Sequence, residues 1–242
     1  MSDFSTEELY DAVDRAVIKL LEAGRVLQPP VPAVRLIQDL FRYTIREDDE
    51  ADESPKQYGD RPKPRPRPGE LVFLPTQSET ARQSLAARAI AKEMVPDILK
   101  TLGVVVGTEQ KSTTNQVVGL IAPRLLLPTK WFAVAARKAN NDLLKLREAF
   151  EPTAYEWIAA RLLELEDPCV MSIVDDGAVS SRKSNFAQMN RKLTEAEERC
   201  AAKVQESEEP QTVRYDGWTS RGWPIPSGPF NRIILRSTPD DV

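Results

Sequence analysis

The side chains whose types and spacing could support chemistry are Arg88 and Lys92, one helical turn apart in an apolar segment. Thr76 and Glu79 form a capping-box pattern, which predicts that a helix starts there and continues through this pair to about Leu99. Two cations on one helical face could bind an anion or a carboxylate. The alternative, which we favour, is an ordinary solvated face whose cations pair with Glu93 or another neighbouring acid.

The composition limits the other kinds of site and partner that the chain is expected to have. The 242 residues include no histidine and two cysteines, Cys169 and Cys200, so neither a disulfide framework nor a cluster of metal-binding thiols is expected. We expect both thiols to be buried and reduced. The net charge of −4 is too small to indicate a protein that coats nucleic acid. The acidic N-terminus and the absence of long apolar runs predict a cytoplasmic protein without membrane contact.

Amphipathic patterns predict a helical majority in the first two thirds of the chain. The clearest helix covers about Thr6 to Ala23, with a capping box of Ser5 and Glu8 at its start and Gly24 at its end. The other expected elements are helices at 34–41, 76–99, 113–127, 128–135, 143–150 and 153–165, and strands at 43–46 and 69–75.

Residues 47–68 interrupt this pattern. Residues 47–53 are almost all acidic, and residues 61–68 alternate Arg or Lys with proline, which favours an extended left-handed helix. Neither block can bury apolar surface, so we expect a solvated, flexible insertion. The alternative is that the basic run contacts phosphate groups or a proline-binding domain.

Residues 168–242 predict a β-rich C-terminal extension. Strands at 170–174 and 178–182 flank the sequence Asp175-Asp176-Gly177, a strong signal for a two-residue hairpin turn. A helix is expected at 193–204, and further strands at 212–215 and 232–236. Trp218 and Trp223 are expected to pack the extension together rather than to bind a ligand. The predicted fold class is α+β, with a mostly helical domain at 1–167 followed by this extension.

Three groups of residues follow the order of motifs in a known family. The first group is Ala122, Leu125, Leu126 and Pro128; the second is Phe150, Thr153, Ile158, Ala159, Arg161, Leu162 and Leu165; the third is Arg182, Ser184, Asn185, Gly222, Trp223, Pro224, Ile233, Leu235 and Arg236. Together they resemble the ImmA/IrrE family of zinc metallopeptidases. The resemblance implies a zincin-like domain, mostly helical, with a small antiparallel sheet.

The resemblance also implies where a zinc site would lie. The family's HExxH motif supplies two zinc ligands and a general base from one helix, because ligands at i and i+4 share a helical face. In this chain the motif can be placed in two registers. In the first, the ligand positions are Arg88 and Lys92 and the base position is Ala89. In the second, the ligand positions are Ala89 and Glu93 and the base position is Ile90. The third ligand position falls on Val117. Neither register can hold and activate zinc, so no catalytic residue, metal or cofactor is predicted.

We therefore expect a degenerate, catalytically inactive ImmA/IrrE-like pseudo-peptidase that acts as a protein-binding or regulatory module. Family members cleave helix-turn-helix repressors, so such a repressor is the candidate protein partner. One alternative is an active metallopeptidase whose metal is held by acids distant in sequence. Another is a DNA-associated regulator, although a nucleic-acid partner is not our expectation because the chain offers no basic recognition face. No oligomeric state is predicted.

Overall fold

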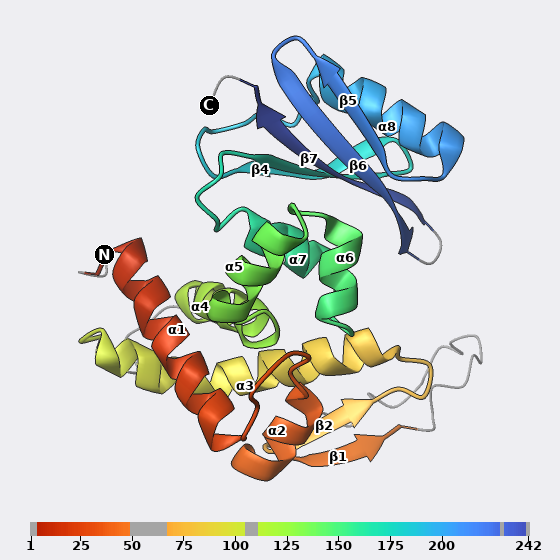
Figure 1. The fold of residues 1–242 in the computed structure, drawn as a ribbon. Coiled ribbons are helices and arrows are strands. Elements are labelled where there is room, and N and C mark those ends of the chain that lie inside the picture. The colour runs from red at the N-terminus through yellow and green to blue at the C-terminus, as the bar shows by residue number, and fades with distance from the viewer. Residues whose placement is uncertain (1–3, 49–66, 105–110, 228–229, 241–242) are drawn as a thin grey trace. The chain divides into compact units, whose positions relative to one another are not determined.

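The computed structural model describes residues 4–48, 67–104, 111–227 and 230–240. Within these ranges the chain combines helices with two sheets, so the predicted α+β fold class is confirmed (Figure 1). The insertion predicted at residues 47–68 falls largely on residues 49–66, which lie outside the described residues.

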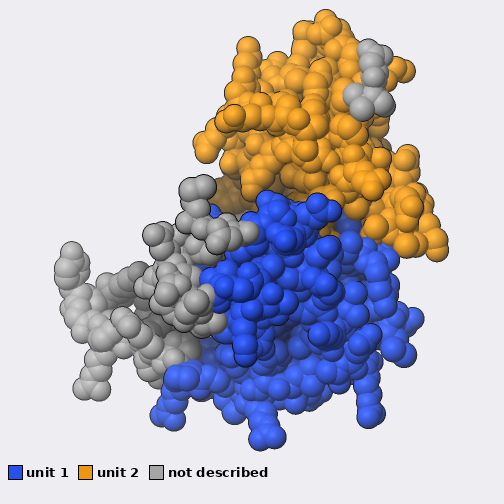
Figure 2. All heavy atoms as spheres, turned by 90° about the vertical axis from the view of Figure 1, so that its left-hand side faces the viewer, with its two compact units in different colours: residues 1–132, 149–154 blue, residues 133–148, 155–242 orange. Residues whose placement is uncertain are grey.

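The chain divides into two compact units, coloured separately in Figure 2. Unit 1 comprises residues 1–132 and 149–154, and unit 2 comprises residues 133–148 and 155–242. The boundary that the sequence suggested after residue 167, between a peptidase-like domain and an extension, stays a prediction.

Unit 1 is built from four helices and a short sheet. Its elements are α1 (Thr6–Ala23), α2 (Ala33–Phe41), β1 (Thr44–Glu47), β2 (Glu70–Phe73), α3 (Glu79–Thr101) and α4 (Lys111–Leu126), and α5 (Thr129–Lys138) begins in it. Helix α3 packs against α2 and α4, and α1 contacts both α3 and α4. The core of the unit includes fully buried side chains from three of these helices, namely Leu36, Ile37, Ile90, Leu99, Ile121 and Leu125.

Local capping explains where two of these helices begin. The capping box of Ser5 and Glu8 starts α1 as predicted, and the helix has the predicted bounds. The prediction that Thr76 caps the next long helix was wrong, because Ser78 is the N-cap of α3 and accepts a hydrogen bond from the Ala81 N–H. The side chain and backbone of Gln77 both bond to Leu74, and this turn delays the start of the helix.

The small sheet of unit 1 differs from the prediction in strand direction. Strands β1 and β2 run parallel, with Thr44 opposite Glu70, whereas an antiparallel sheet was expected. Antiparallel neighbours can be joined by a tight turn, but a parallel pair needs a connection of about a dozen residues or more. Residues 48–69, which connect these strands, are long enough for that crossover.

Unit 2 combines short helices with one antiparallel sheet of five strands. Its elements after α5 are α6 (Leu143–Ala149), α7 (Tyr155–Leu162), β3 (Val170–Asp175), β4 (Ala178–Ser184), α8 (Glu195–Ser207), β5 (Gln211–Tyr215), β6 (Trp218–Ser227) and β7 (Phe230–Pro239). The strand order is β4-β3-β7-β6-β5. The predicted turn between β3 and β4 is confirmed, since Asp176 and Gly177 both have positive φ.

The two faces of this sheet have different partners within unit 2. Helix α8 covers one face, where Val204 and Cys200 join a buried cluster with Leu235 (Figure 1). Trp223 and Ile234 lie fully buried elsewhere on the sheet. Two arginines of the strands bind acids near the short helices; these ion pairs are Arg232 with Glu156 and Arg221 with Asp142.

Asp142 joins a helix to the sheet through its two carboxylate oxygens. Its Oδ1 accepts a hydrogen bond from the Lys145 N–H at 3.0 Å and so caps the start of α6. Its Oδ2 accepts from the guanidinium of Arg221 on β6. The carboxylate is buried, so the cap and the ion pair share one site that is largely shielded from water.

Both cysteines are buried, as predicted, and neither forms a disulfide. Burial raises the pKa of Cys169 and raises the pKa of Cys200 to about 11. The two thiols are therefore protonated near neutral pH, which makes them poor nucleophiles.

The length and hydropathy of the described helices indicate whether any of them could cross a membrane. None of these helices is by itself long and apolar enough to cross a bilayer. One pair, Thr114–Leu126 with Thr129–Lys138, reaches the necessary length and composition together but bends by 60° between its halves.

Candidate binding groove on helix α3

The residues singled out by the sequence lie on different faces of α3. Arg88 and Lys92 are exposed, whereas Ala89 and Ile90 are buried against the core of unit 1. Glu93 is exposed. In the first register, both ligand positions therefore face solvent and carry cations; in the second, only Glu93 offers an accessible carboxylate.

Val117, at the third ligand position, lies on α4 and is buried, with 3% of its surface exposed. Helix α4 packs against α3, the helix that carries the other positions singled out above. Among the described residues, no group of three or more His, Cys, Asp or Glu side chains is arranged to hold a metal ion.

A groove of about 540 Å³ does lie on this helix, between α1 and α3. Its base includes apolar side chains from both helices, and Phe41 from the end of α2 contributes an aromatic ring. We call this cavity the α1–α3 groove. Its lining residues are Ala12, Arg15, Ala16, Lys19, Leu20, Phe41, Glu93, Met94, Asp97, Ile98 and Thr101. A volume of this size is typical of ligand pockets.

The two walls of the α1–α3 groove carry opposite charge. Helix α1 contributes Arg15 and Lys19, and α3 contributes Glu93 and Asp97. Each pair is spaced by four residues, which places both members on one helical face. Within the described part of the chain, Lys19 and Asp97 form no side-chain ion pair or hydrogen bond, so both charges are available to a ligand.

The carboxylate of Glu93 is held in place by Tyr43. The phenolic hydroxyl donates a hydrogen bond of 2.5 Å to Glu93 Oε1. This hydrogen bond, with smaller contributions from burial and from the negative charge of Glu93, raises the pKa of Tyr43 to about 12. The hydroxyl therefore remains a donor at all physiological pH values, and one oxygen of Glu93 is left for another partner.

A second cluster fixes the basic wall against the core of unit 1. Asp14 on α1 accepts hydrogen bonds from Arg124 on α4 and from the Thr129 hydroxyl, both at 2.9 Å. The guanidinium of Arg124 also lies 4.0 Å from the centre of the Tyr10 ring, a cation–π contact. Because Asp14 directly precedes Arg15, this cluster sets the position from which the basic wall projects.

The sequence contained a signal for part of this groove. The i, i+4 pairs Arg15–Lys19 and Glu93–Asp97 are visible in the sequence, each beside an apolar stripe. Only the folded arrangement, however, brings α1 and α3 together and adds Phe41 between them. Chemically, the groove can bind a partner of mixed charge with an apolar centre, and it contains no paired nucleophile and base.

Comparison with known proteins reveals a likeness of fold to solved structures. No protein-family model matches this chain, and no curated protein sequence matches it. Among solved structures, a Mycobacterium tuberculosis transcriptional regulator has a similar fold, with a TM-score of 0.68. The two are 17% identical in sequence, and the match covers 96% of this chain and 80% of the regulator.

Proposed function

We propose that this chain is a regulatory protein-binding module, built on a degenerate ImmA/IrrE-like peptidase domain, and that the α1–α3 groove holds its partner. The observation that carries the proposal is the opposed charge of the two walls, Arg15 and Lys19 facing Glu93 and Asp97, on the helix where a peptidase would present its metal ligands. Such a surface selects its partner by charge as well as by shape.

The residue types at the peptidase motif support a loss of hydrolysis. A catalytic zinc site needs three protein ligands, an open position for water and a nearby base. The ligand positions Arg88 and Lys92 repel a cation, and a valine occupies position 117. An inactive domain that keeps a binding groove accounts for both the sequence resemblance to the family and the missing ligands.

We further propose that the partner is a helix-turn-helix repressor, the class of protein that the resembled family acts on. A short helix with an apolar residue between an acid and a base would match the groove and its two walls. The transcriptional regulator with a similar fold supports a regulatory role for this chain. At 17% sequence identity, the likeness between the two concerns the fold alone.

The test uses a purified helix-turn-helix repressor and measures its affinity for this chain by calorimetry. Reversing the acidic wall with Glu93→Lys and Asp97→Lys should weaken binding at least about ten-fold, because each cation now repels a basic group of the partner. The matched control, Glu206→Lys with Glu209→Lys, changes the net charge equally at exposed positions of unit 2. Equal affinity of both variants, or no binding of the repressor to the natural chain, would reject the proposed groove or partner.

A second measurement separates binding from hydrolysis. The repressor is incubated with the natural chain, with and without a chelator, and its length is followed by mass spectrometry. The proposal requires an intact repressor in both samples. Chelator-sensitive cleavage would instead establish the alternative of an active metallopeptidase, and salt-dependent retention on DNA would favour the alternative of a DNA-associated regulator.

A further inference from the structure

A second and larger groove lies in unit 2, away from every residue of the peptidase motif. It has a volume of about 840 Å³ and runs between α8 and the ends of β6 and β7. We call it the α8 groove. It belongs to unit 2 alone, so it is independent of the α1–α3 groove in both residues and proposed role.

Part of the wall of the α8 groove is apolar and partly uncovered. Helix α8 contributes the small side chains of Ala201 and Ala202, which leave space in the groove on this side. The opposite wall includes Pro224, Pro226 and Phe230. Phe230 is 51% exposed, and it is one of few large apolar side chains in the described residues with so much free surface. Phe230 therefore adds exposed apolar surface that a ligand in the groove would cover.

The charge of the α8 groove is negative. Glu198 in the first turn of α8 and Glu208, the residue that caps its C-terminal end, both line the groove. Among the described residues neither forms a side-chain ion pair or hydrogen bond. The nearby cation, Arg232, is already neutralised by Asp175 and Glu156. A ligand therefore meets apolar walls together with two unpaired carboxylates.

The spacing of these carboxylates sets the length of a matching ligand. Glu208 follows Glu198 by ten residues and caps the end of α8, so their backbones are about 15 Å apart along the helix axis at a rise of 1.5 Å per residue. An extended left-handed peptide advances about 3.1 Å per residue, so about five residues cover the same distance. Proline and aromatic side chains on the facing wall are the surfaces on which such extended, proline-containing peptides pack.

From these observations we propose that the α8 groove is a docking site for a short extended segment of a protein partner. The segment carries two basic residues five positions apart, with apolar residues and prolines between them. The cations pair with Glu198 and Glu208, and the apolar side chains cover Phe230 and the two alanines. The partner is recognised by local sequence, so it need not share a fold with any protein that binds unit 1.

The probe for this site is the blocked peptide Arg-Pro-Leu-Pro-Leu-Arg, titrated into the full-length protein and followed by calorimetry. Saturable binding at one peptide per chain is expected. Replacing Glu198 and Glu208 by glutamine should weaken it at least about five-fold, because the charge pairs at the rim are lost while the shape is kept. The matched control, Glu206→Gln with Glu209→Gln, removes the same charge outside the groove and should bind as the natural chain does.

A steric variant and two control peptides complete the test. Ala202→Trp fills the groove from an exposed helical position and should abolish binding without loss of fold, which circular dichroism would verify. The peptides Glu-Pro-Leu-Pro-Leu-Glu and Arg-Pro-Ser-Pro-Ser-Arg should bind at least about ten-fold more weakly than the probe. Equal binding of either peptide, undiminished binding to Ala202→Trp, or no saturable binding of the probe would overturn the proposal.

Discussion

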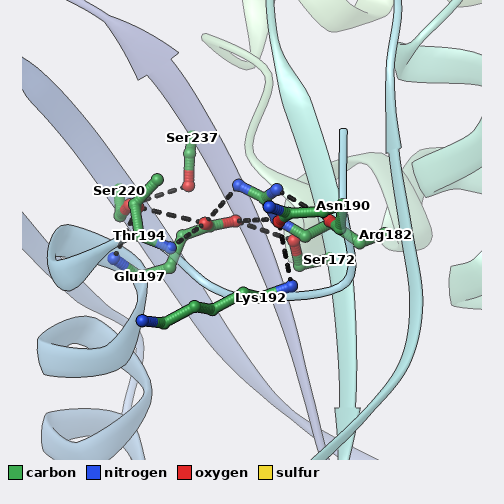
Figure 3. A network of polar contacts seen from close by, with 8 residues as sticks. All are labelled: Ser172, Arg182, Asn190, Lys192, Thr194, Glu197, Ser220 and Ser237. Atoms are coloured by element: carbon green, nitrogen blue, oxygen red, sulfur yellow. Dashed lines mark hydrogen bonds and ion pairs between the residues drawn. The ribbon is translucent and has the colours of Figure 1, made fainter. Parts of the chain in front are cut away.

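Glu197 on α8 and Arg182 on β4 form an ion pair in the interior of unit 2. The guanidinium donates a hydrogen bond of 2.7 Å to Glu197 Oε2, and the side chains are 0% and 2% exposed. Glu197 also accepts hydrogen bonds from the Ser172 hydroxyl and from the Thr194 N–H, which makes it part of the capping box of α8 (Figure 3). One carboxylate thus joins the start of a helix to two strands of the sheet.

Removing one partner of this pair should destabilise the protein strongly. Arg182→Ala or Glu197→Ala leaves an unpaired charge in a site that excludes water, at a cost of about 3–5 kcal/mol. The double variant Arg182→Met with Glu197→Met should lose less than the sum of the two single changes, because no buried charge is left behind. Urea unfolding followed by circular dichroism measures all three. Single changes that cost less than about 1 kcal/mol would contradict the buried geometry.

The same pair predicts how stability depends on pH. Burial alone would raise the pKa of Glu197, but hydrogen bonds from Arg182, Thr194 and Ser172 outweigh it and lower the pKa below the ordinary value of 4.5. The stabilisation is therefore complete above pH 4.5 and is lost as the pH falls through the lowered pKa of the folded state. Melting temperatures of the natural chain should fall in that acidic range, and Glu197→Gln should show a smaller fall. Identical pH profiles would count against this assignment.

The hairpin turn at Gly177 offers a local test of the fold. Its φ is +80°, and a Cβ atom at this position would have no neighbouring atom within 4 Å, so backbone conformation is the main obstacle to substitution. Gly177→Val should destabilise the protein by about 1 kcal/mol or more, because a β-branched residue resists positive φ. Gly177→Asn is the control, since asparagine tolerates this conformation and should cost clearly less. Thermal unfolding of both variants decides the point.

Titration of Tyr43 tests one wall of the α1–α3 groove. With its pKa raised to about 12, the phenol keeps its proton in the folded state beyond the ordinary value of 10. Its contribution to stability is complete below pH 10 and is lost as the pH rises towards 12. Phenolate absorbance, compared between the natural chain and Tyr43→Phe, isolates this group. Glu93→Gln should lower the pKa of Tyr43 towards 10, and an unchanged titration in that variant would disprove the hydrogen bond.

Metal content tests the proposed loss of catalysis. The purified protein should contain well under one equivalent of zinc, and a chelator should leave its melting temperature unchanged, because no metal binding energy supports the fold. Restoring the motif with Arg88→His, Ala89→Glu and Lys92→His should raise zinc uptake if the first register is right. Val117→Glu adds the third ligand, at the cost of burying a carboxylate. Stoichiometric zinc in the natural chain would reject the pseudo-peptidase proposal.

Local sequence signals predicted the elements well. The capping box at Ser5 identified the start of α1, and the Asp176-Gly177 pair identified the hairpin turn. Each of these signals acts over a few residues, between side chains and their own backbone. Such interactions are fully contained in a short stretch of sequence, which is why they could be recognised without a structure.

Features that depend on distant contacts were not predictable in the same way. The parallel pairing of β1 with β2 depends on the path of the connection between them, which composition does not determine. The α1–α3 groove requires Lys19 and Asp97 to lie on opposite walls, on two helices that are far apart in sequence. The ion pair of Arg182 with Glu197 could not be predicted either, because the sequence does not show which charged side chains are buried.

Asp142 restricts which residues natural variation can place at its position. Asparagine would still cap α6, but it would leave Arg221 without a counter-charge. Glutamate would keep the charge, but its longer side chain is a poorer helix cap. A substitution of Asp142 therefore requires a simultaneous substitution of Arg221. The two positions are expected to vary together among related sequences.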